Sequence, residues 1–361
     1  MKMKYDYSII VDEILLWFEK EKRDLPWRRN PLPYYVWISE IMLQQTRVEA
    51  VKEYFKRFLA ELPTIESLAT VEDDKLMKLW EGLGYYNRAR NLKKAAVQIM
   101  EQYNGELPKD YKELISLPGI GSYTAGAIAS QAYGIAEPAV DGNVLRVTKR
   151  LAGSYDDITK ASVKKELEEE LKKIMPQNET GSTYNKAGAF NQALMELGAI
   201  VCIPNGKPLC EKCPLQKKCI AYEKNIIMEL PVKPSKKARK IEKKTVFVFE
   251  WNGRYGIHKR AKKGLLANLW EFPNVEEMYS ISKVERFLEK QGILEYEMEL
   301  LGEAKHTFSH VEWHMLGYKI KIKEIKKEQA IFMEDLVWVT EKELFENYAL
   351  PTAFGAFKQK I

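Results

Sequence analysis

The most constraining feature of the sequence is a glycine-rich turn that joins a short apolar segment to a helix of small residues. The turn, Gly119-Ile120-Gly121, follows Leu117-Pro118, and the small-residue helix is predicted from Ser122 to Ala132. Two glycines within three residues permit backbone angles that residues with a Cβ avoid. They also leave N–H groups bare at the start of the next helix, where its dipole favours an anion. We therefore predict a turn that grips phosphate without reading sequence.

A single carboxylate follows this turn by about twenty residues. Asp141, in the segment Val140–Asn143, stands directly before a predicted basic helix that carries Arg146, Lys149 and Arg150. A turn that binds phosphate, with an acid placed beyond it, indicates chemistry on a nucleotide.

These two segments together resemble a known superfamily. LPGIGSYTAGAIAS followed by VDGNVLRVTKR is similar to the helix-hairpin-helix, Gly/Pro-rich loop and aspartate of the endonuclease III superfamily of DNA glycosylases. For LPGIG alone, a generic turn between two core helices remains an alternative. The resemblance implies that Gly119 and Gly121 contact the DNA backbone, that Asp141 stabilises a charged sugar, and that Asn143 positions Asp141 or a water.

The residue after Gly121-Ser122 bears on the type of reaction. In bifunctional members of the superfamily a lysine at this place attacks the sugar and the strand is then cut. Here the position holds Tyr123, whose phenol cannot form a Schiff base. The resemblance therefore implies a monofunctional enzyme that leaves the abasic strand intact.

A second segment carries a candidate acid. A helix is predicted from Tyr35 to Arg47, with Glu40 near its start, where an ordinary acid would interact favourably with the helix dipole. WISEIMLQQTRVEAV, however, closely resembles MutY-type adenine DNA glycosylases, in which the glutamate is the catalytic acid and the QQT run contacts the duplex. Glu40 is thus the implied acid, and Gln45, as a wedge, and Thr46 are implied DNA contacts.

The same resemblance implies two further groups of residues. An adenine pocket would have Trp27 and Leu43 as walls and Arg28 and Gln192 as base contacts. GLGYYNRARNL is similar to a loop that inserts into DNA, which implies wedges at Leu83 and Tyr85; ordinary packing is the alternative for these aromatic residues. HTFSH matches the family loop that reads 8-oxoguanine. The residues implied in that role are Phe308, Ser309 and His310.

The four cysteines all lie within eighteen residues of one another, and they are Cys202, Cys210, Cys213 and Cys219. With none left to form disulfides elsewhere, they indicate a reducing compartment and one compact metal centre. Zinc is an alternative, but zinc ribbons have two separated CxxC knuckles and this chain has one. Closely spaced thiolates with Cys213-Pro214 favour a [4Fe–4S] cluster. The family spacing is C-x6-C-x2-C-x5-C; here the first gap holds seven residues.

Hydropathy and charge divide the chain. Residues 1–221 are predicted to form an all-helical catalytic domain, with the helix-hairpin-helix at about 111–133 and the cysteine loop at 202–219. A basic linker follows at 222–243. Residues 233–244 hold seven basic residues and one acid, so the net charge of this segment is +6, the same as the net charge of the whole chain. Residues 244–361 show short alternating runs typical of strands, with helices near 283–290 and 341–345. GLLANLWEFP in this part resembles the Nudix-like C-terminal domain of MutY.

The fold class predicted from these patterns is multidomain: an all-α glycosylase domain with an iron–sulfur loop, then an α+β Nudix-like lesion-recognition domain. The predicted function is removal of adenine opposite 8-oxoguanine or guanine in double-stranded DNA. Two alternatives are a related enzyme that excises another base, such as thymine, and a non-catalytic protein that binds damaged DNA. With no apolar run near 18 residues and no signal pattern, we expect a soluble, cytoplasmic, nucleoid-associated monomer.

Overall fold

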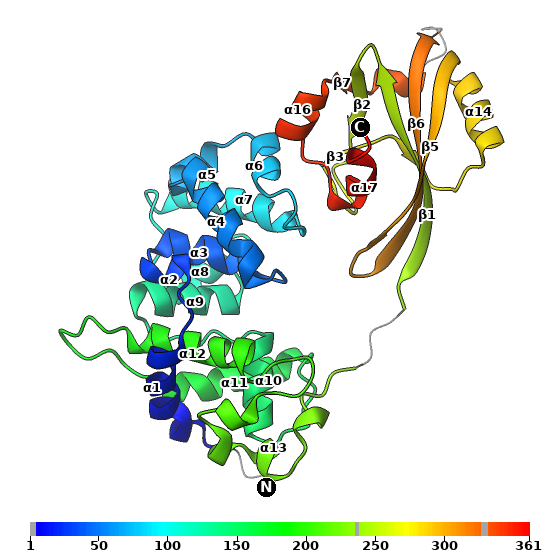
Figure 1. Cartoon of the computed structure of the whole chain (residues 1–361). Coiled ribbons are helices and arrows are strands. Elements are labelled where there is room, and N and C mark those ends of the chain that lie inside the picture. The colour runs from blue at the N-terminus through cyan, green and yellow to red at the C-terminus, as the bar shows by residue number, and fades with distance from the viewer. Residues whose placement is uncertain (1–4, 235–237, 326–330) are drawn as a thin grey trace. The chain divides into compact units, whose positions relative to one another are not determined.

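The computed structural model in Figure 1 describes residues 5–234, 238–325 and 331–361. The chain divides into two compact units. The first unit comprises residues 1–70 and 90–235, and the second comprises residues 71–89 and 236–361. This division differs from the boundaries predicted from the sequence, because residues 71–89 group with the C-terminal part of the chain.

The first unit is built from helices. Its α-helices are α1 (Val11–Glu21), α2 (Pro26–Arg29), α3 (Pro33–Leu43), α4 (Val48–Glu61), α5 (Ile65–Thr70), α8 (Tyr111–Ser116), α9 (Ser122–Tyr133), α10 (Gly142–Leu151), α11 (Ala161–Ile174), α12 (Lys186–Ile200) and α13 (Ile220–Glu223). Short 3-10 turns lie at η1 (Tyr7–Ile10), η2 (Cys210–Lys212), η3 (Gln216–Lys218) and η4 (Ile227–Glu229). Helix α7 (Asn87–Gln102) begins in the second unit and continues in the first.

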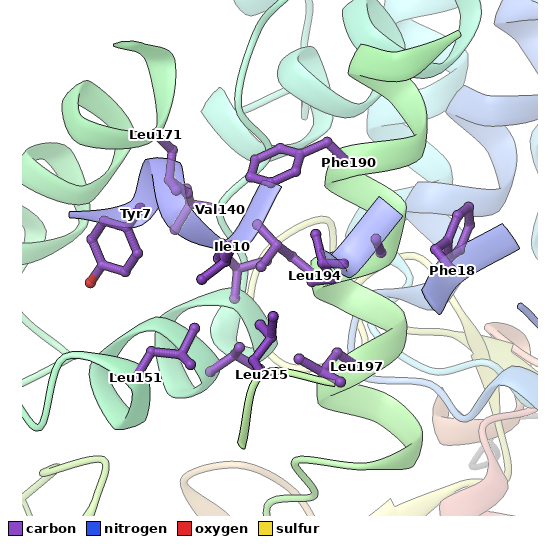
Figure 2. Close-up of a cluster of buried hydrophobic side chains, with 14 of the residues drawn as sticks. Tyr7, Ile10, Phe18, Val140, Leu151, Leu171, Phe190, Leu194, Leu197 and Leu215 are labelled. Carbon is purple, nitrogen blue, oxygen red and sulfur yellow. The ribbon is translucent and has the colours of Figure 1, made fainter. Parts of the chain in front are cut away.

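A large apolar cluster forms the core of this helical unit. It collects side chains from η1, α1, α10, α11 and α12, as Figure 2 shows. Phe190, Leu194 and Leu197 lie on one side of α12 at a helical spacing and are buried against Ile10 and Val140. This packing orders α12 against α10, and α10 begins directly after Asp141.

Helix α3 starts earlier than the sequence pattern indicated. Pro33 occupies the first turn, where a missing N–H costs no hydrogen bond, and the helix ends at Leu43. Glu40 is consequently the eighth of eleven helical residues, so the prediction that it lies near the helix start is wrong. Gln45 lies beyond the helix with a φ of 59°. Favourable interaction with the N-terminal dipole therefore does not explain Glu40.

The second unit contains a mixed sheet with the strand order β3-β2-β1-β6-β5, while β4 pairs with β1 and β7 with β2. The strands are β1 (Lys240–Trp251), β2 (Arg254–Lys259), β3 (Trp270–Glu271), β4 (Asn274–Val275), β5 (Ile293–Thr307), β6 (Val311–Ile325) and β7 (Val337–Val339). β1 and β6 run parallel, and the other pairs are antiparallel. The helices are α6 (Asp73–Leu79), α14 (Ile281–Lys290), α15 (Ile331–Glu334), α16 (Glu341–Glu346) and α17 (Gly355–Lys358). The predicted α+β class is confirmed.

Each face of this sheet carries its own apolar core, because side chains alternate along a strand. Val246 and Val248 of β1 belong to one cluster, which includes Trp313 and Phe354. Phe247 and Phe249 point to the opposite cluster, against which α14 packs. The loop that holds Phe308 therefore lies on the Trp313 side of the sheet and α14 on the other side.

Residues 71–89 are tied to the sheet-containing part of the second unit by polar contacts. Asp74 accepts a hydrogen bond from Lys259 at 2.8 Å. Glu81 accepts one hydrogen bond from the Lys358 ammonium at 3.2 Å and another from the Leu350 backbone N–H at 3.1 Å. These contacts explain why a segment from the middle of the helical sequence groups with the C-terminal residues.

The irregular connection between the two units is shorter than the linker predicted at residues 222–243. Helix α13 reaches Glu223, and the carbonyl of Val232 accepts a hydrogen bond from Ile158 within the first unit. Strand β1 already begins at Lys240, ahead of the predicted domain start at 244. Of the described helices, none is both long and apolar enough to cross a membrane.

Candidate active site

Glu40 is buried where α3 packs on α9, with only 4% of its surface exposed. Its Oε2 accepts a hydrogen bond from the Tyr123 phenol, and its Oε1 accepts one from Gln131 Nε2 at 3.0 Å. Tyr123 and Gln131 are eight residues apart on α9, so they share one helix face. Burial raises the pKa of Glu40 above its ordinary 4.5, and the two hydrogen bonds and the charge of Arg28 offset only part of that rise. The carboxyl is thus suited to carry a proton nearer neutral pH.

The glycine-rich turn has the backbone that the sequence predicts. Gly119 has a φ of 78°, and a Cβ added there would lie 2.7 Å from Asn91 Cβ. A second glycine, Gly126, is enclosed by backbone: a Cβ would lie 2.1 Å from the carbonyl oxygen of Pro138. Only glycine therefore allows the chain before Asp141 to lie directly on α9, the helix that carries Tyr123. Gly121 begins α9 and faces open space, as a contact for an external group requires.

Asp141 is the N-cap of α10. Its Oδ1 accepts a hydrogen bond from the Val144 backbone N–H at 2.8 Å, and its Oδ2 accepts one from Asn143 Nδ2 at 2.7 Å. An N-cap residue satisfies a backbone donor at the start of the helix, so the carboxylate is held in one orientation. Asn143 thus contacts Asp141 directly.

The pKa values of the two carboxyls, Glu40 and Asp141, are shifted in the same direction. Burial raises the pKa of Asp141 as well, although Val144, Asn143 and the charge of Arg146 lower it in part. The negative charge of Asp141 in turn raises the pKa of Glu40. Burial and both carboxyl charges raise the pKa of Tyr123 well above 10, so its phenol stays a donor. An ionised Asp141 is consequently less stable here than in water.

Two arginines of α10 join the aspartate to the cysteine loop. Arg146 Nη2 donates to Asn143 Oδ1 at 3.0 Å, and its Nε donates to the Cys202 carbonyl at 2.9 Å. Arg150 Nη1 lies 3.3 Å from Cys202 Sγ and also donates to the Ile203 carbonyl at 3.0 Å. A continuous set of hydrogen bonds thus runs from Asp141 through Asn143 and Arg146 to the loop that begins at Cys202.

All four cysteines line one pocket at the end of this network, together with Val147, Leu151 and Leu197. Each is partly exposed, and none of the four forms a disulfide. Burial, with a smaller contribution from the neighbouring cysteines, raises the pKa of Cys213 to about 12. Four thiolates can occupy such a pocket only with a cationic centre among them, because their charges would otherwise repel one another. The donor set therefore fits a thiolate-bound metal centre. Among the residues that the structure describes, no three Cys, His, Asp or Glu side chains converge as ligands of a single metal ion.

Arg28 does not point freely into a pocket but belongs to a buried ion cluster. Its Nη2 donates to Glu196 Oε2 at 2.8 Å, and its Nη1 donates to the Arg23 carbonyl at 3.1 Å. Arg23 binds the same carboxylate through Nε at 2.6 Å and Nη2 at 3.0 Å. Burial raises the pKa of Glu196, but the hydrogen bonds from Arg23 and Arg28 outweigh burial and bring it to about 2.

The other residues of the predicted adenine pocket are less directly tied to Glu40. Trp27 is buried and packs edge-on against Phe55 at 5.5 Å between ring centroids. Leu43 and Gln192 are both partly exposed, on α3 and α12 respectively. Glu40 accepts its hydrogen bonds from Tyr123 and Gln131.

The residues expected to contact DNA stand on two turns with unusual backbones. Gln45 has a φ of 59° and is exposed, and Thr46 beside it is partly exposed. In the second unit, Tyr85 has a φ of 47° and is 48% exposed. Left-handed backbone is uncommon for residues other than glycine and asparagine, and such strain is often found at functional positions. Leu83, by contrast, is buried, so it can act as a wedge only after a rearrangement.

The HTFSH loop joins β5 to β6 in the second unit. Phe308 packs between His306 and Trp313, at 4.5 and 4.9 Å between ring centroids. Ser309 and His310 are exposed, and Ser309 Oγ lies 2.9 Å from the Tyr85 hydroxyl. The two segments that the sequence assigned to DNA contact, Tyr85 and Ser309, are therefore brought together within this unit.

Sequence reasoning missed three side chains that shape the site, Gln131, Arg23 and Glu196, and it named Arg146 without its partners. Gln131 could have been found from its spacing of two helical turns after Tyr123. Glu196 follows Gln192 by one turn of a helix already known to be apolar, and a carboxylate in such a helix signals a buried partner. No local pattern identifies Arg23 or the contact of Arg146 with Cys202, since these partners are distant in the sequence.

The helical fold, with Glu40 buried against the helix after the glycine-rich turn and Asp141 at the N-cap of α10, is typical of a class of DNA repair enzymes, and comparison with known proteins agrees. Residues 38–173 match the HhH-GPD superfamily of base excision DNA repair proteins, and residues 245–360 match the NUDIX domain family. A solved thermostable thymine-DNA glycosylase is 32% identical, with a TM-score of 0.53, over 60% of this chain and 96% of that chain. An endonuclease III bound to DNA is 29% identical, with a TM-score of 0.51, over 63% of this chain and 99% of that chain. The protein is thus a DNA glycosylase of the helix-hairpin-helix type.

Full-length relatives narrow the family. The adenine DNA glycosylase of Buchnera aphidicola subsp. Schizaphis graminum is 36% identical over 88% of this chain and 88% of its own length. The human adenine DNA glycosylase is 32% identical over 94% of this chain and 71% of its own length. The chain belongs to the adenine DNA glycosylase family of base excision repair.

Proposed function

We propose that this protein removes adenine mispaired with 8-oxoguanine or guanine by hydrolysing its N-glycosidic bond, and that it leaves the DNA strand uncut. The observation that carries the proposal is the buried Glu40, whose carboxyl has a raised pKa and a hydrogen bond from Tyr123 on the helix after the glycine-rich turn. The HTFSH loop, residues 306–310, supports the proposal that 8-oxoguanine is the base opposite the adenine.

The target base must first leave the duplex, because a stacked base cannot reach a buried acid. The strained, exposed turns at Gln45 and Tyr85 are the proposed wedges that fill the space it leaves. The bare N–H groups at Gly119 and Gly121 would hold the phosphate backbone, since the start of α9 favours an anion.

Glu40 is the proposed general acid. Its raised pKa keeps a proton available for N7 of the flipped adenine, which turns the base into a better leaving group. As the bond from the base nitrogen to C1′ breaks, its electron pair goes to the protonated adenine. Gln131 and Tyr123 would hold the carboxyl in place during this transfer.

Asp141 is the proposed stabiliser of the sugar. Its partly buried carboxylate is less stable than in water, and a positive charge that develops on the sugar would relieve that cost. Water then adds to C1′, and its proton passes to a carboxylate. Asn143, which donates to Asp141, would orient the carboxylate or this water. Two carboxyls that act as acid and stabiliser follow the logic of glycoside hydrolysis.

Strand cleavage after alkali tests this function directly. A duplex with one adenine opposite 8-oxoguanine should break at that position only after alkali, and a duplex with adenine opposite guanine should follow more slowly. A duplex with thymine opposite guanine is the control, because the similar solved structure is that of a thymine-DNA glycosylase. Release of thymine in preference to adenine, or breakage without alkali, would contradict the proposal.

The four cysteines are proposed to hold a [4Fe–4S] cluster, which when bound would supply a structural cross-link of the loop 202–219. The pocket lined by all four thiols and the hydrogen bonds from Arg150 to this loop support that assignment. The one-residue-longer gap after Cys202 is accommodated in the loop, since Leu209 N–H still bonds to the Val201 carbonyl.

We expect protein purified without oxygen to be brown, with absorbance near roughly 400 nm and about four iron atoms per chain. Cys213→Ser should lose iron and lower Tm by several degrees, because a metal centre that cross-links a loop contributes to folding. Asn205→Ser, in the same loop but not a ligand, is the control and should keep its iron. Stoichiometric zinc in place of iron would contradict the assignment.

The C-terminal unit is proposed to discriminate 8-oxoguanine from guanine through the HTFSH loop. We expect Ser309→Ala to narrow the ratio of excision rates on the two substrates by about fivefold, because a hydrogen bond contributes about 1 kcal/mol. Single-turnover rates on both duplexes provide the ratio. Ser282→Ala, on α14 at the other face of the sheet, is the control. An unchanged ratio in Ser309→Ala would reject the role.

A further inference from the structure

Gln131 is a buried amide that bonds directly to the proposed acid, yet its place in the proposed reaction goes no further than holding that carboxyl. Its side-chain Nε2 donates to Glu40 Oε1 at 3.0 Å, and only 7% of the residue is exposed. The other carboxyl oxygen, Oε2, accepts from the Tyr123 phenol. The two oxygens of one buried carboxyl therefore have different partners, an amide and a phenol.

The two partners differ in what they offer when the carboxyl changes its protonation state. Burial raises the pKa of Tyr123 well above 10, so its phenol keeps its proton and donates in either state. An amide has both an N–H donor and a carbonyl acceptor. Within the described residues no donor contacts the amide oxygen of Gln131, so that oxygen is available to a protonated acid. Gln131 can therefore satisfy Glu40 Oε1 as a carboxylic acid and as a carboxylate.

The last turn of α9, which carries Gln131, is fixed by α12 and by the residue before it. Asn185 Nδ2 donates to the Ser130 carbonyl at 2.7 Å and to the Gln131 carbonyl at 3.1 Å. Gly188 of α12 approaches so closely that an added Cβ would lie 2.9 Å from Gln131 Cα. The amide is thus set beside Glu40 before any substrate binds, and a donor placed in advance needs no reorganisation during the reaction.

The bond from Gln131 is one of several influences on the charge of Glu40. Burial raises the pKa of this carboxyl, and the hydrogen bonds from Tyr123 and Gln131 lower it. The charge of Asp141 raises it, and the charge of Arg28 lowers it. A hydrogen bond donated to a carboxylate favours the ionised form. Removal of the Gln131 amide would leave the other influences in place and isolate the effect of one bond.

We propose that Gln131 is a positioning residue that supports Glu40 Oε1 in both protonation states and, by donating to the carboxylate left behind, helps the acid release its proton to the base. The proposal rests on the proposed function, in which Glu40 protonates adenine. The proton passes to N7, and the carboxylate keeps the electron pair of the broken O–H bond. The Gln131 N–H then stabilises that new charge, which an apolar side chain of the same size could not do.

The first test is the pH dependence of single-turnover excision on a duplex with adenine opposite 8-oxoguanine. Gln131→Met removes the amide and keeps the length of the side chain. Because the carboxylate then lacks a donor, Glu40 should hold its proton to higher pH, and the alkaline limb should move up by about one pH unit. The plateau rate should fall about fivefold, because the acid becomes a weaker proton donor. Gln98→Met on α7, where the amide donates to Gln102, is the control and should change neither.

Thermal denaturation tests the same bond without catalysis. Ionisation of Glu40 costs folding free energy above its ordinary pKa of 4.5, and loss of the Gln131 donor should increase that cost. The Tm deficit of Gln131→Met relative to wild type should therefore be larger at about pH 8 than at about pH 4. In the Glu40→Gln background the same substitution should give a deficit that does not depend on pH, because no carboxyl remains there to titrate.

The inference fails if the limb stays at the wild-type pH or if the Tm deficit is equal at both pH values. Gln131 would then only fill space beside Glu40. If Gln131→Met does not fold, Gln131→Asn decides, because its amide is one methylene too short to reach Oε1 and should move the limb in the same direction. Wild-type protein that releases no adenine would instead remove the proposed function, while the Tm profiles would still decide whether Gln131 supports the carboxylate.

Discussion

Glu40→Gln is expected to slow adenine release by about 10³-fold while the affinity for mispaired duplex stays within a few-fold of wild type. Glutamine has the same size and keeps an oxygen that can accept from Tyr123 or Gln131, but it has no proton to give. A positioned general acid contributes roughly 10²–10⁴-fold in rate, which sets the size of the loss. Single-turnover kinetics, alongside a binding titration with the same duplex, measure the two quantities separately.

The matched control for this experiment is Glu66→Gln, an exposed acid on α5. It should change neither rate nor affinity. Near-normal excision by Glu40→Gln would mean that another group protonates the base. Equal losses of rate and affinity would mean that Glu40 supports the pocket rather than the chemistry.

The same substitution should also stabilise the protein. Because the pKa of Glu40 is raised in the folded state, its ionisation at higher pH costs folding free energy. The cost is absent below the ordinary pKa of 4.5, and it is fully present above the folded-state pKa. Glu40→Gln removes this cost, so its Tm should exceed that of wild type at neutral pH and equal it in acid. Each 1 kcal/mol corresponds to about 2–4 °C in a domain of this size.

Tyr123→Lys is expected to convert a monofunctional enzyme into one that forms a covalent DNA complex. The wild-type phenol cannot form a Schiff base, so borohydride should trap no complex. A lysine at this place would project from α9 toward Glu40 and the sugar proposed to lie beside Asp141. Asp141 would keep its orientation, because it is held by Val144 and Asn143 rather than by Tyr123.

Trapping by Tyr123→Lys should increase with pH. Both carboxyls near this position favour the charged ammonium, and only the neutral amine attacks the sugar. Tyr133→Lys is the control, since Tyr133 lies on the same helix but donates to the Leu107 carbonyl. Efficient trapping of the wild type would overturn the assignment of a monofunctional reaction. No trapping at any pH in Tyr123→Lys would mean that the α9 position does not face the sugar.

The sequence alone was sufficient where the chemistry is local. The turn at Gly119 needs a left-handed backbone, and Asp141 stands at the N-cap of the helix predicted after it. The run Thr245–Phe249 predicted a strand, and the structure confirms it as part of β1. Four cysteines in one short loop could only converge. Each of these features depends on neighbours within a few residues, so the pattern carries the information.

Only the tertiary structure decided how distant groups affect one another. The extent of α3 depends on Pro33 and on packing against α9, so the place of Glu40 within its helix was misjudged. The raised pKa of Asp141 depends on burial by the whole helical unit, which no local pattern reports. Glu196 meets Arg23 across 173 residues, and Arg146 meets Cys202 across 56. Charge and burial act through space, and proximity in space between such residues exists only once the chain has folded.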